Sequence, residues 1–170
     1  MDPLVIRREI PRDIPLIHGV NAAAFDTTAE ARLVDALRAA GAATLSLVAE
    51  ERGEIVGHIL FSPVTIEGRP GLDVVGLAPM AVVPARQRQG IGSRLVREGL
   101  AELRQKGCVG VVVLGHPRYY PRFGFVPASR LGLRCEYDSP DEAFMALELV
   151  PGALAGPPGL VRYHPELSRL

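Results

Sequence analysis

The order of the predicted elements makes this chain an α+β (α/β) domain with a mixed central sheet flanked by helices. Helical periodicity comes first, a hairpin of alternating apolar residues follows, and a strand–helix–strand unit occupies the middle of the chain. With 170 residues, 48% of them hydrophobic, the chain can bury one core without a metal or disulfide staple. We expect residues 1–150 to form the domain and residues 151–170 to form a tail packed on it.

Two helices are expected near the N-terminus, after a short strand at residues 5–7. Asp13 can cap a helix that runs through Phe25, because apolar residues recur along it at helical spacing. A second helix covers residues 28–40. Gly41 is expected to end it, since glycine readily adopts the left-handed conformation found at helix C-termini.

Three strands are expected next. Residues 45–50 and 55–66 form an antiparallel hairpin, and a third strand covers residues 73–83. The third strand contains Pro79, which lacks a backbone donor for the ladder. We therefore expect a bulge or break at this proline.

A strand–helix–strand unit completes the centre of the sheet. The helix covers residues 90–106, and residues 109–114 form an apolar run typical of a strand buried on both faces. The crossover makes this strand a parallel neighbour of the preceding one. Further strands are expected near Phe125 and at residues 144–149, whereas the proline- and glycine-rich tail from Pro151 is expected to be irregular.

Charge and composition exclude several classes of protein. Lys and Arg total 19, as do Asp and Glu, and this balance argues against a general nucleic acid binder, which needs surplus positive charge. No apolar run reaches the length that spans a bilayer. Cys108 and Cys135 have neither disulfide-framework nor metal-ligand spacing. We expect no metal, no nucleic acid and no membrane partner, and a reducing cytoplasm as the location.

The turn that opens the helix at residues 90–106 has the character of an anion site. Gly90 and Gly92 let the backbone close around a ligand, and the N–H groups at a helix N-terminus are unpaired and partly positive. The alternative interpretation is a tight turn beside solvated arginines. Two other phosphate motifs fail, because no lysine follows Gly92 and Leu95 stands where a third glycine is needed.

Two motifs resemble the GCN5-related N-acetyltransferase (GNAT) superfamily. Gln87-Arg-Gln-Gly-Ile-Gly92 fits the Arg/Gln-x-x-Gly-x-Gly/Ala signature of its acetyl-CoA loop, and Tyr120-Pro-Arg-Phe-Gly-Phe125 fits its later Tyr-x-x-x-Gly-Phe. The wider segments 57–63 and 115–127 are similar to a bacterial subgroup of these N-acetyltransferases. The resemblance implies the GNAT fold, in which a mostly antiparallel sheet contains one parallel, splayed pair of strands.

The resemblance also implies acetyl-CoA (CoA) as the cofactor and assigns residues to it. The strand segment 80–82 matches the one whose backbone pairs with the pantetheine arm, and the N–H groups of residues 88–93 would hold the pyrophosphate. The cofactor-binding residues expected on this basis are Met80, Ala81, Val82, Gln87, Arg88, Gln89, Gly90, Ile91, Gly92 and Ser93.

Tyr120 matches the general acid of the superfamily, and Tyr119 is the adjacent alternative. A phenol with an ordinary pKa near 10 can protonate or hydrogen-bond the thiolate that leaves when an amine attacks a thioester. No Glu occurs at residues 74–83, where many members carry their base. His58 and His116 are the candidate bases, because imidazole titrates near neutral pH. A chain of waters is a further candidate.

Together these features predict an acetyl-CoA-dependent N-acetyltransferase that moves an acetyl group to a primary amine by direct attack in a ternary complex. The acceptor is a small-molecule or peptide amine. Dimers are common in the superfamily, which leaves a homodimer open. The alternative is a non-catalytic regulatory module that binds CoA or acyl-CoA, which the missing strand Glu favours. A domain that binds some other anion is a third interpretation.

Overall fold

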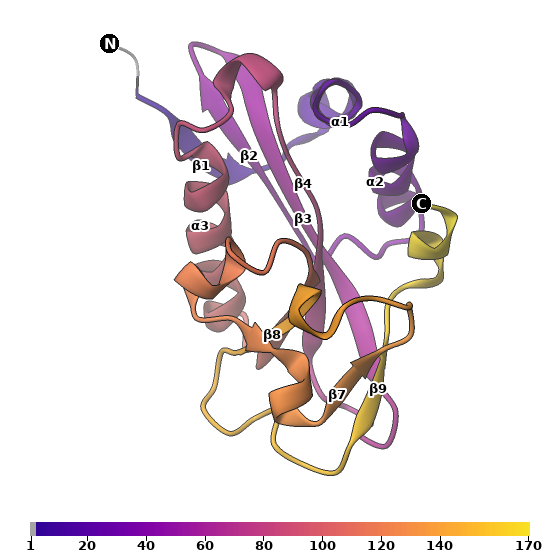
Figure 1. Ribbon diagram of the computed structural model, residues 1–170. Helices are drawn as coiled ribbons and strands as arrows, with labels where there is room; N and C mark the ends of the chain where they lie inside the picture. The colour runs from indigo at the N-terminus through magenta and orange to yellow at the C-terminus, as the bar shows by residue number, and fades with distance from the viewer. Residues whose placement is uncertain (1–2) are drawn as a thin grey trace.

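A twisted sheet runs the length of the molecule, and helices lie against both of its faces (Figure 1). The computed structural model describes residues 3–170. In spatial order, the strands of this sheet are β1 (Val5–Arg8), β2 (Leu45–Glu51), β3 (Glu54–Ile66), β4 (Val74–Val82), β5 (Gly110–Leu114), β8 (Phe144–Glu148) and β6 (Val126–Pro127). All neighbours on this path are antiparallel except β4 and β5.

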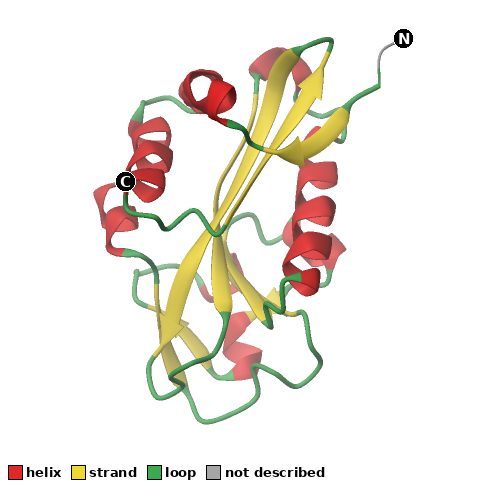
Figure 2. Cartoon of the chain, turned by 180° about the vertical axis from the view of Figure 1, so that it is seen from behind, coloured by secondary structure: helices red, strands yellow, loops and turns green. Residues whose placement is uncertain are grey.

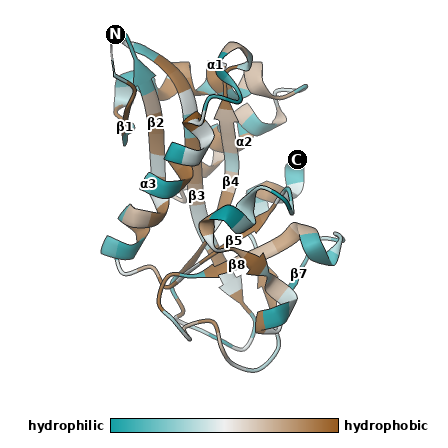
Figure 3. Ribbon diagram, turned by 60° about the vertical axis from the view of Figure 1, so that its left-hand side comes forward, coloured by the Kyte–Doolittle hydropathy of each residue, from teal (hydrophilic) through white to brown (hydrophobic). Residues whose placement is uncertain are grey.

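The sheet divides the hydrophobic core into two clusters, one on each of its faces. Helices α1 (Ile14–Ala24) and α2 (Ala29–Ala39) bury their apolar sides on one face of the sheet, and α3 (Ile91–Gln105) buries its own on the other (Figure 2). Apolar residues concentrate in the central strands, while the helices show both polar and apolar stretches, as amphipathic elements do (Figure 3). The predicted helices and the hairpin are confirmed. Within residues 3–170, no helix is long and apolar enough to cross a membrane.

The parallel strands β4 and β5 separate part of the way along β4. They pair only from Val74 opposite Gly110 to Gly76 opposite Val112. Beyond that point β4 continues along β3, with a shift of register next to Pro79, while β5 continues along β8. The predicted splay and the predicted irregularity at Pro79 are both confirmed.

The C-terminal tail differs from the sequence prediction. Residues after Pro151 were expected to be irregular, but β9 (Gly159–Arg162) pairs with the far end of β3 and with β7 (Leu133–Cys135). Leu154 and Val161 are both fully buried. The prediction of an irregular tail is wrong, because a strand of four residues has too little periodicity to be recognised without its partners.

Asp13 precedes α1 as expected, but its side chain does not cap the helix. Its carboxylate instead accepts hydrogen bonds from the Arg7 guanidinium at 2.7 and 3.0 Å and from the Ile10 N–H at 2.8 Å. These bonds, those from Arg7 above all, lower the pKa of Asp13. The Asp13 carboxylate therefore pairs with Arg7 of β1 and does not cap α1. This ion pair connects β1 to the start of α1.

A buried polar network connects α1 to the sheet. His58 on β3 has no exposed surface, and its Nδ1 lies 3.1 Å from the amide nitrogen of Asn21. Its Nε2 lies 2.9 Å from Ser46 Oγ, which donates in turn to Glu9. An amide nitrogen can only donate, so Nδ1 is the acceptor and the ring proton is on Nε2. Burial lowers the pKa of His58 to about 3, so the ring is neutral.

This network predicts that stability falls as the solution is acidified below the ordinary histidine pKa of 6.5. The unfolded chain binds a proton at His58 and the folded chain does not, which costs about 1.4 kcal/mol per pH unit below about pH 6. Urea unfolding at about pH 7 and about pH 5.5 measures the slope, and His58→Gln should remove this part of it. NMR of the folded wild type provides the control. A His58 ring that titrates between about pH 5 and 7 contradicts the prediction.

Candidate active site

A cavity of about 710 Å³ lies where β4, the start of α3 and the segment after β5 come together. It forms beyond the point at which β4 and β5 separate. The cavity is lined by Met80, Val82, Arg86, Gln87, Arg88, Gly90, Ile91, Gly92, Ser93, His116, Tyr119, Tyr120 and Arg122. The glycine-containing turn and the tyrosine segment, which are distant in sequence, therefore face one cavity.

The amino end of α3 presents unpaired N–H groups at this cavity. Gly90, immediately before the helix, has a φ of 85°, and the bond from Arg94 N to Gly90 O at 3.1 Å begins the helical pattern. The N–H groups of residues 91–93 consequently have no partner within the helix. Arg88 also has a positive φ, of 63°, a conformation that costs free energy in a residue other than glycine. Such strain is typical of functional turns.

Gly92 lies close to two side chains of the cavity wall. A Cβ atom there would lie 3.3 Å from Met80 Cε and 3.4 Å from the Tyr119 hydroxyl. That hydroxyl is 3.0 Å from Ser93 Oγ, and the Arg122 guanidinium lies 4.5 Å from the centre of the Tyr119 ring. Any side chain at Gly92 would therefore intrude on a tightly packed wall.

Polar side chains hold the turn before α3 in place. Arg86 binds the Glu51 carboxylate with two hydrogen bonds, at 2.5 and 3.0 Å, and these bonds lower the pKa of Glu51. Gln87 donates to the Val82 carbonyl at 2.9 Å. Gln89 accepts from Arg86 at 3.0 Å. These contacts tie the turn to β2 and β4, so that the N–H groups are presented in a fixed arrangement.

Tyr120 is largely buried, with 8% of its surface exposed. Its ring meets Tyr119 and Phe125 edge to face, with centroid distances of 5.1 and 5.6 Å. A Cβ atom on Gly115 would lie 2.6 Å from the Tyr120 ring, so the chain must be glycine there. Burial raises the pKa of Tyr120, and the phenol is protonated throughout the physiological range.

The structure does not bring every candidate to the cavity. The side chain of Ala81 is buried in the core on the opposite face, and Gln89 is directed to Arg86. His58 is buried in its own network and is absent from the lining, whereas His116 is exposed and belongs to it. The cavity also includes Arg86 and Arg122, which the glycine motif could not single out because their positions depend on long-range packing. The remaining cofactor candidates, Tyr120 and Tyr119 all line the cavity.

Comparison with known proteins identifies the family. Residues 42–127 match the family described as Acetyltransferase (GNAT) domain. The chain is 42% identical over 167 residues to the uncharacterized N-acetyltransferase YhbS of Escherichia coli K12, a match that covers 98% of this chain and 99% of YhbS. It is 44% identical over 130 residues to the uncharacterized N-acetyltransferase YjhQ of the same strain, covering 74% and 72%. The chain belongs to the GNAT acetyltransferase family and is an acyltransferase, as the sequence predicted.

Two solved structures are similar over nearly the whole chain. The crystal structure of GNAT family N-acetyltransferase YhbS from Escherichia coli in complex with CoA has a TM-score of 0.95 and 42% identity, and the match covers 100% of this chain and 94% of that one. A GNAT family acetyltransferase from Brucella melitensis in complex with acetyl-CoA has a TM-score of 0.81 and 44% identity, with 97% and 98% covered. The predicted GNAT fold is confirmed.

Proposed function

We propose that this chain is an acetyl-CoA-dependent N-acetyltransferase that acetylates a primary amine by direct attack within a ternary complex. The observation that carries this proposal is one cavity that combines the unpaired N–H groups opening α3 with the Tyr120 phenol. The CoA and acetyl-CoA complexes of the two related structures support the cofactor. We place the enzyme in the cytoplasm, because Cys108 and Cys135 are free thiols.

The residues present fit the two ends of this cofactor. The N–H groups of residues 91–93 and the guanidinium groups of Arg88 and Arg122 can hold the diphosphate, and Gly92 keeps a side chain out of its path. Among residues 3–170, no strand pairs with the β5-facing edge of β4 beyond Gly76. The backbone groups of residues 80–82 that face this edge can thus hydrogen-bond the amide groups of the pantetheine arm, as a neighbouring strand would, although the Val82 carbonyl already accepts from Gln87.

Tyr120 supplies the hydrogen bond that stabilises the leaving group. Acetyl-CoA brings an activated thioester, whose cleavage by an amine releases a thiolate. The raised pKa keeps the Tyr120 hydroxyl protonated, so it donates to that sulfur as negative charge develops. In the part of the chain that the structure describes, neither cysteine lines the cavity. Direct transfer therefore agrees with the geometry better than an acyl-enzyme.

His116 or solvent removes the proton of the amine. His116 lines the cavity and is exposed, so it can pass a proton to water. His58 has no part in this proposal, because its ring is buried, neutral and occupied at both nitrogens by Asn21 and Ser46. A general base on β4, where many family members carry a Glu, is then not needed.

Gly92→Val should weaken acetyl-CoA binding at least about 10-fold, because the branched side chain enters the space next to Met80 and Tyr119. Isothermal titration calorimetry measures the dissociation constant. Gly19→Val is the matched control, since a side chain at Gly19 in α1 meets nothing within 4 Å. If both variants bound acetyl-CoA as tightly as the wild type does, the diphosphate would not lie at the amino end of α3.

Tyr120→Phe should lower kcat about 100-fold and leave acetyl-CoA affinity within about 2-fold, because the lost hydrogen bond forms only as the thiolate develops. Release of free CoA thiol measures the rate, and Tyr119→Phe is the comparison. A loss of rate in Tyr119→Phe alone would assign the role to Tyr119. Wild-type protein that binds acetyl-CoA yet releases no CoA with any of a broad panel of amines would instead be the regulatory module.

A further inference from the structure

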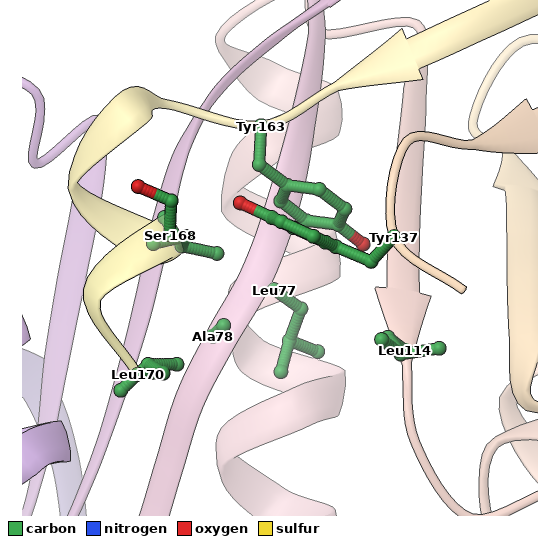
Figure 4. Close-up of a pocket in the computed structure, with 8 residues that line it drawn as sticks. Leu77, Ala78, Leu114, Tyr137, Tyr163, Ser168 and Leu170 are labelled. Atoms are coloured by element: carbon green, nitrogen blue, oxygen red, sulfur yellow. The ribbon is translucent and has the colours of Figure 1, made fainter. Parts of the chain in front are cut away.

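Tyrosines line both the cavity at the amino end of α3 and a second cavity, but only the first set has charged side chains against it. Tyr137 and Tyr163 line the second cavity, of about 330 Å³ (Figure 4). In the described part of the chain, no Asp, Glu, Lys, Arg or His side chain lines it, so it offers no charged group to an anion. The rings of Tyr119 and Phe123, in contrast, each have a guanidinium group against them. This aromatic segment is therefore the one to consider for a role in cofactor binding.

Tyr119 holds the Arg122 side chain through two contacts. The Arg122 guanidinium lies 4.5 Å from the centre of the Tyr119 ring, and Arg122 Nε donates to the Tyr119 carbonyl at 2.9 Å. Among residues 3–170, Nη1 and Nη2 of Arg122 donate to no protein group. Arg122 also lines the cavity at the amino end of α3. A guanidinium that is stacked on a ring and bonded through Nε keeps its two terminal nitrogens for an anion in that cavity.

The Tyr119 hydroxyl connects the same ring to the first turn of α3. Its oxygen lies 3.0 Å from Ser93 Oγ, and a Cβ atom on Gly92 would lie 3.4 Å from it. The N–H groups of Gly92 and Ser93 are among those without a partner within the helix. Tyr119 therefore joins two groups that can hold an anion, the amino end of α3 and the Arg122 guanidinium.

A second pair in the same segment has similar chemistry outside the cavity. The Phe123 ring packs edge to face with the Tyr119 ring, at a centroid distance of 5.3 Å. The Arg97 guanidinium lies 5.1 Å from the centre of the Phe123 ring. Neither Phe123 nor Arg97 is among the residues that line the cavity. This pair therefore provides matched controls for Tyr119 and Arg122.

We propose, on the basis of the function proposed above, that Tyr119 is a positioning residue for the cofactor. It holds Arg122 so that Nη1 and Nη2 meet the diphosphate beside the N–H groups of residues 91–93. Arg122 is exposed, and an exposed arginine without such contacts samples many rotamers, so ordering it on binding costs free energy. Tyr119 lowers this cost because it keeps the side chain in place before the cofactor binds. Tyr120 then acts on the sulfur, while Tyr119 acts on the diphosphate through Arg122.

Calorimetry with acetyl-CoA tests this role through a double-mutant cycle. Arg122→Gln and Tyr119→Leu should each weaken binding about 10-fold, and the double variant should be no more than about 2-fold weaker than either, because both changes remove the same interaction. Tyr119→Phe keeps the ring against Arg122 and loses only the bond to Ser93, so its affinity should stay within about 3-fold of wild type. A double variant about 100-fold weaker than wild type would show independent contributions and overturns the inference. Arg122→Gln that binds as tightly as wild type overturns it as well.

The matched controls separate positioning from a general loss of packing. Phe123→Leu and Arg97→Gln should bind acetyl-CoA within about 2-fold of wild type. Raising NaCl from about 50 to about 300 mM should weaken binding less in Arg122→Gln and Tyr119→Leu than in wild type, because the charge interaction that salt screens is already lost. Equal losses in Tyr119→Leu and Phe123→Leu, or a salt response in Arg122→Gln equal to that of wild type, overturn the inference and leave the proposed function standing. Wild-type protein that binds no acetyl-CoA overturns the proposed function itself.

Discussion

The separation of β4 from β5 is the constraint on which the rest of this structure depends. After Gly76 and Val112 the two parallel strands have different partners, and among residues 3–170 no strand pairs with the edge of β4 that faces β5. Backbone groups freed in this way need other hydrogen-bond partners, and we propose that a pantetheine arm supplies them. The cavity at the amino end of α3 forms beside this break.

Two features from different parts of the chain are attached to β3, the strand next to β4. The network around His58 fixes α1 against β3, the strand that β4 follows beyond the break. The small sheet of β7 and β9 extends from the end of β3 and brings Tyr137 and Tyr163 over the gap.

Sequence alone predicted the elements with strong hydrophobic periodicity and the glycine-containing turn before α3. Helix α3 and its glycine turn were recognisable because an amphipathic stripe and left-handed residues leave a local signal. Strand β9 left no such signal, since its pairing with β3 and β7 joins segments far apart in the chain. His58 illustrates the same limit, because its residue type allows a base, while its burial between Asn21 and Ser46 is a property of the fold.

A crystal structure of this protein with acetyl-CoA tests the central claim most directly. The account predicts diphosphate oxygens within hydrogen-bond distance of the N–H groups of residues 91–93, and the arm lying along residues 80–82. It also predicts the thioester sulfur within reach of the Tyr120 hydroxyl. A cofactor bound elsewhere, or bound here with β4 and β5 paired beyond Gly76, would contradict it.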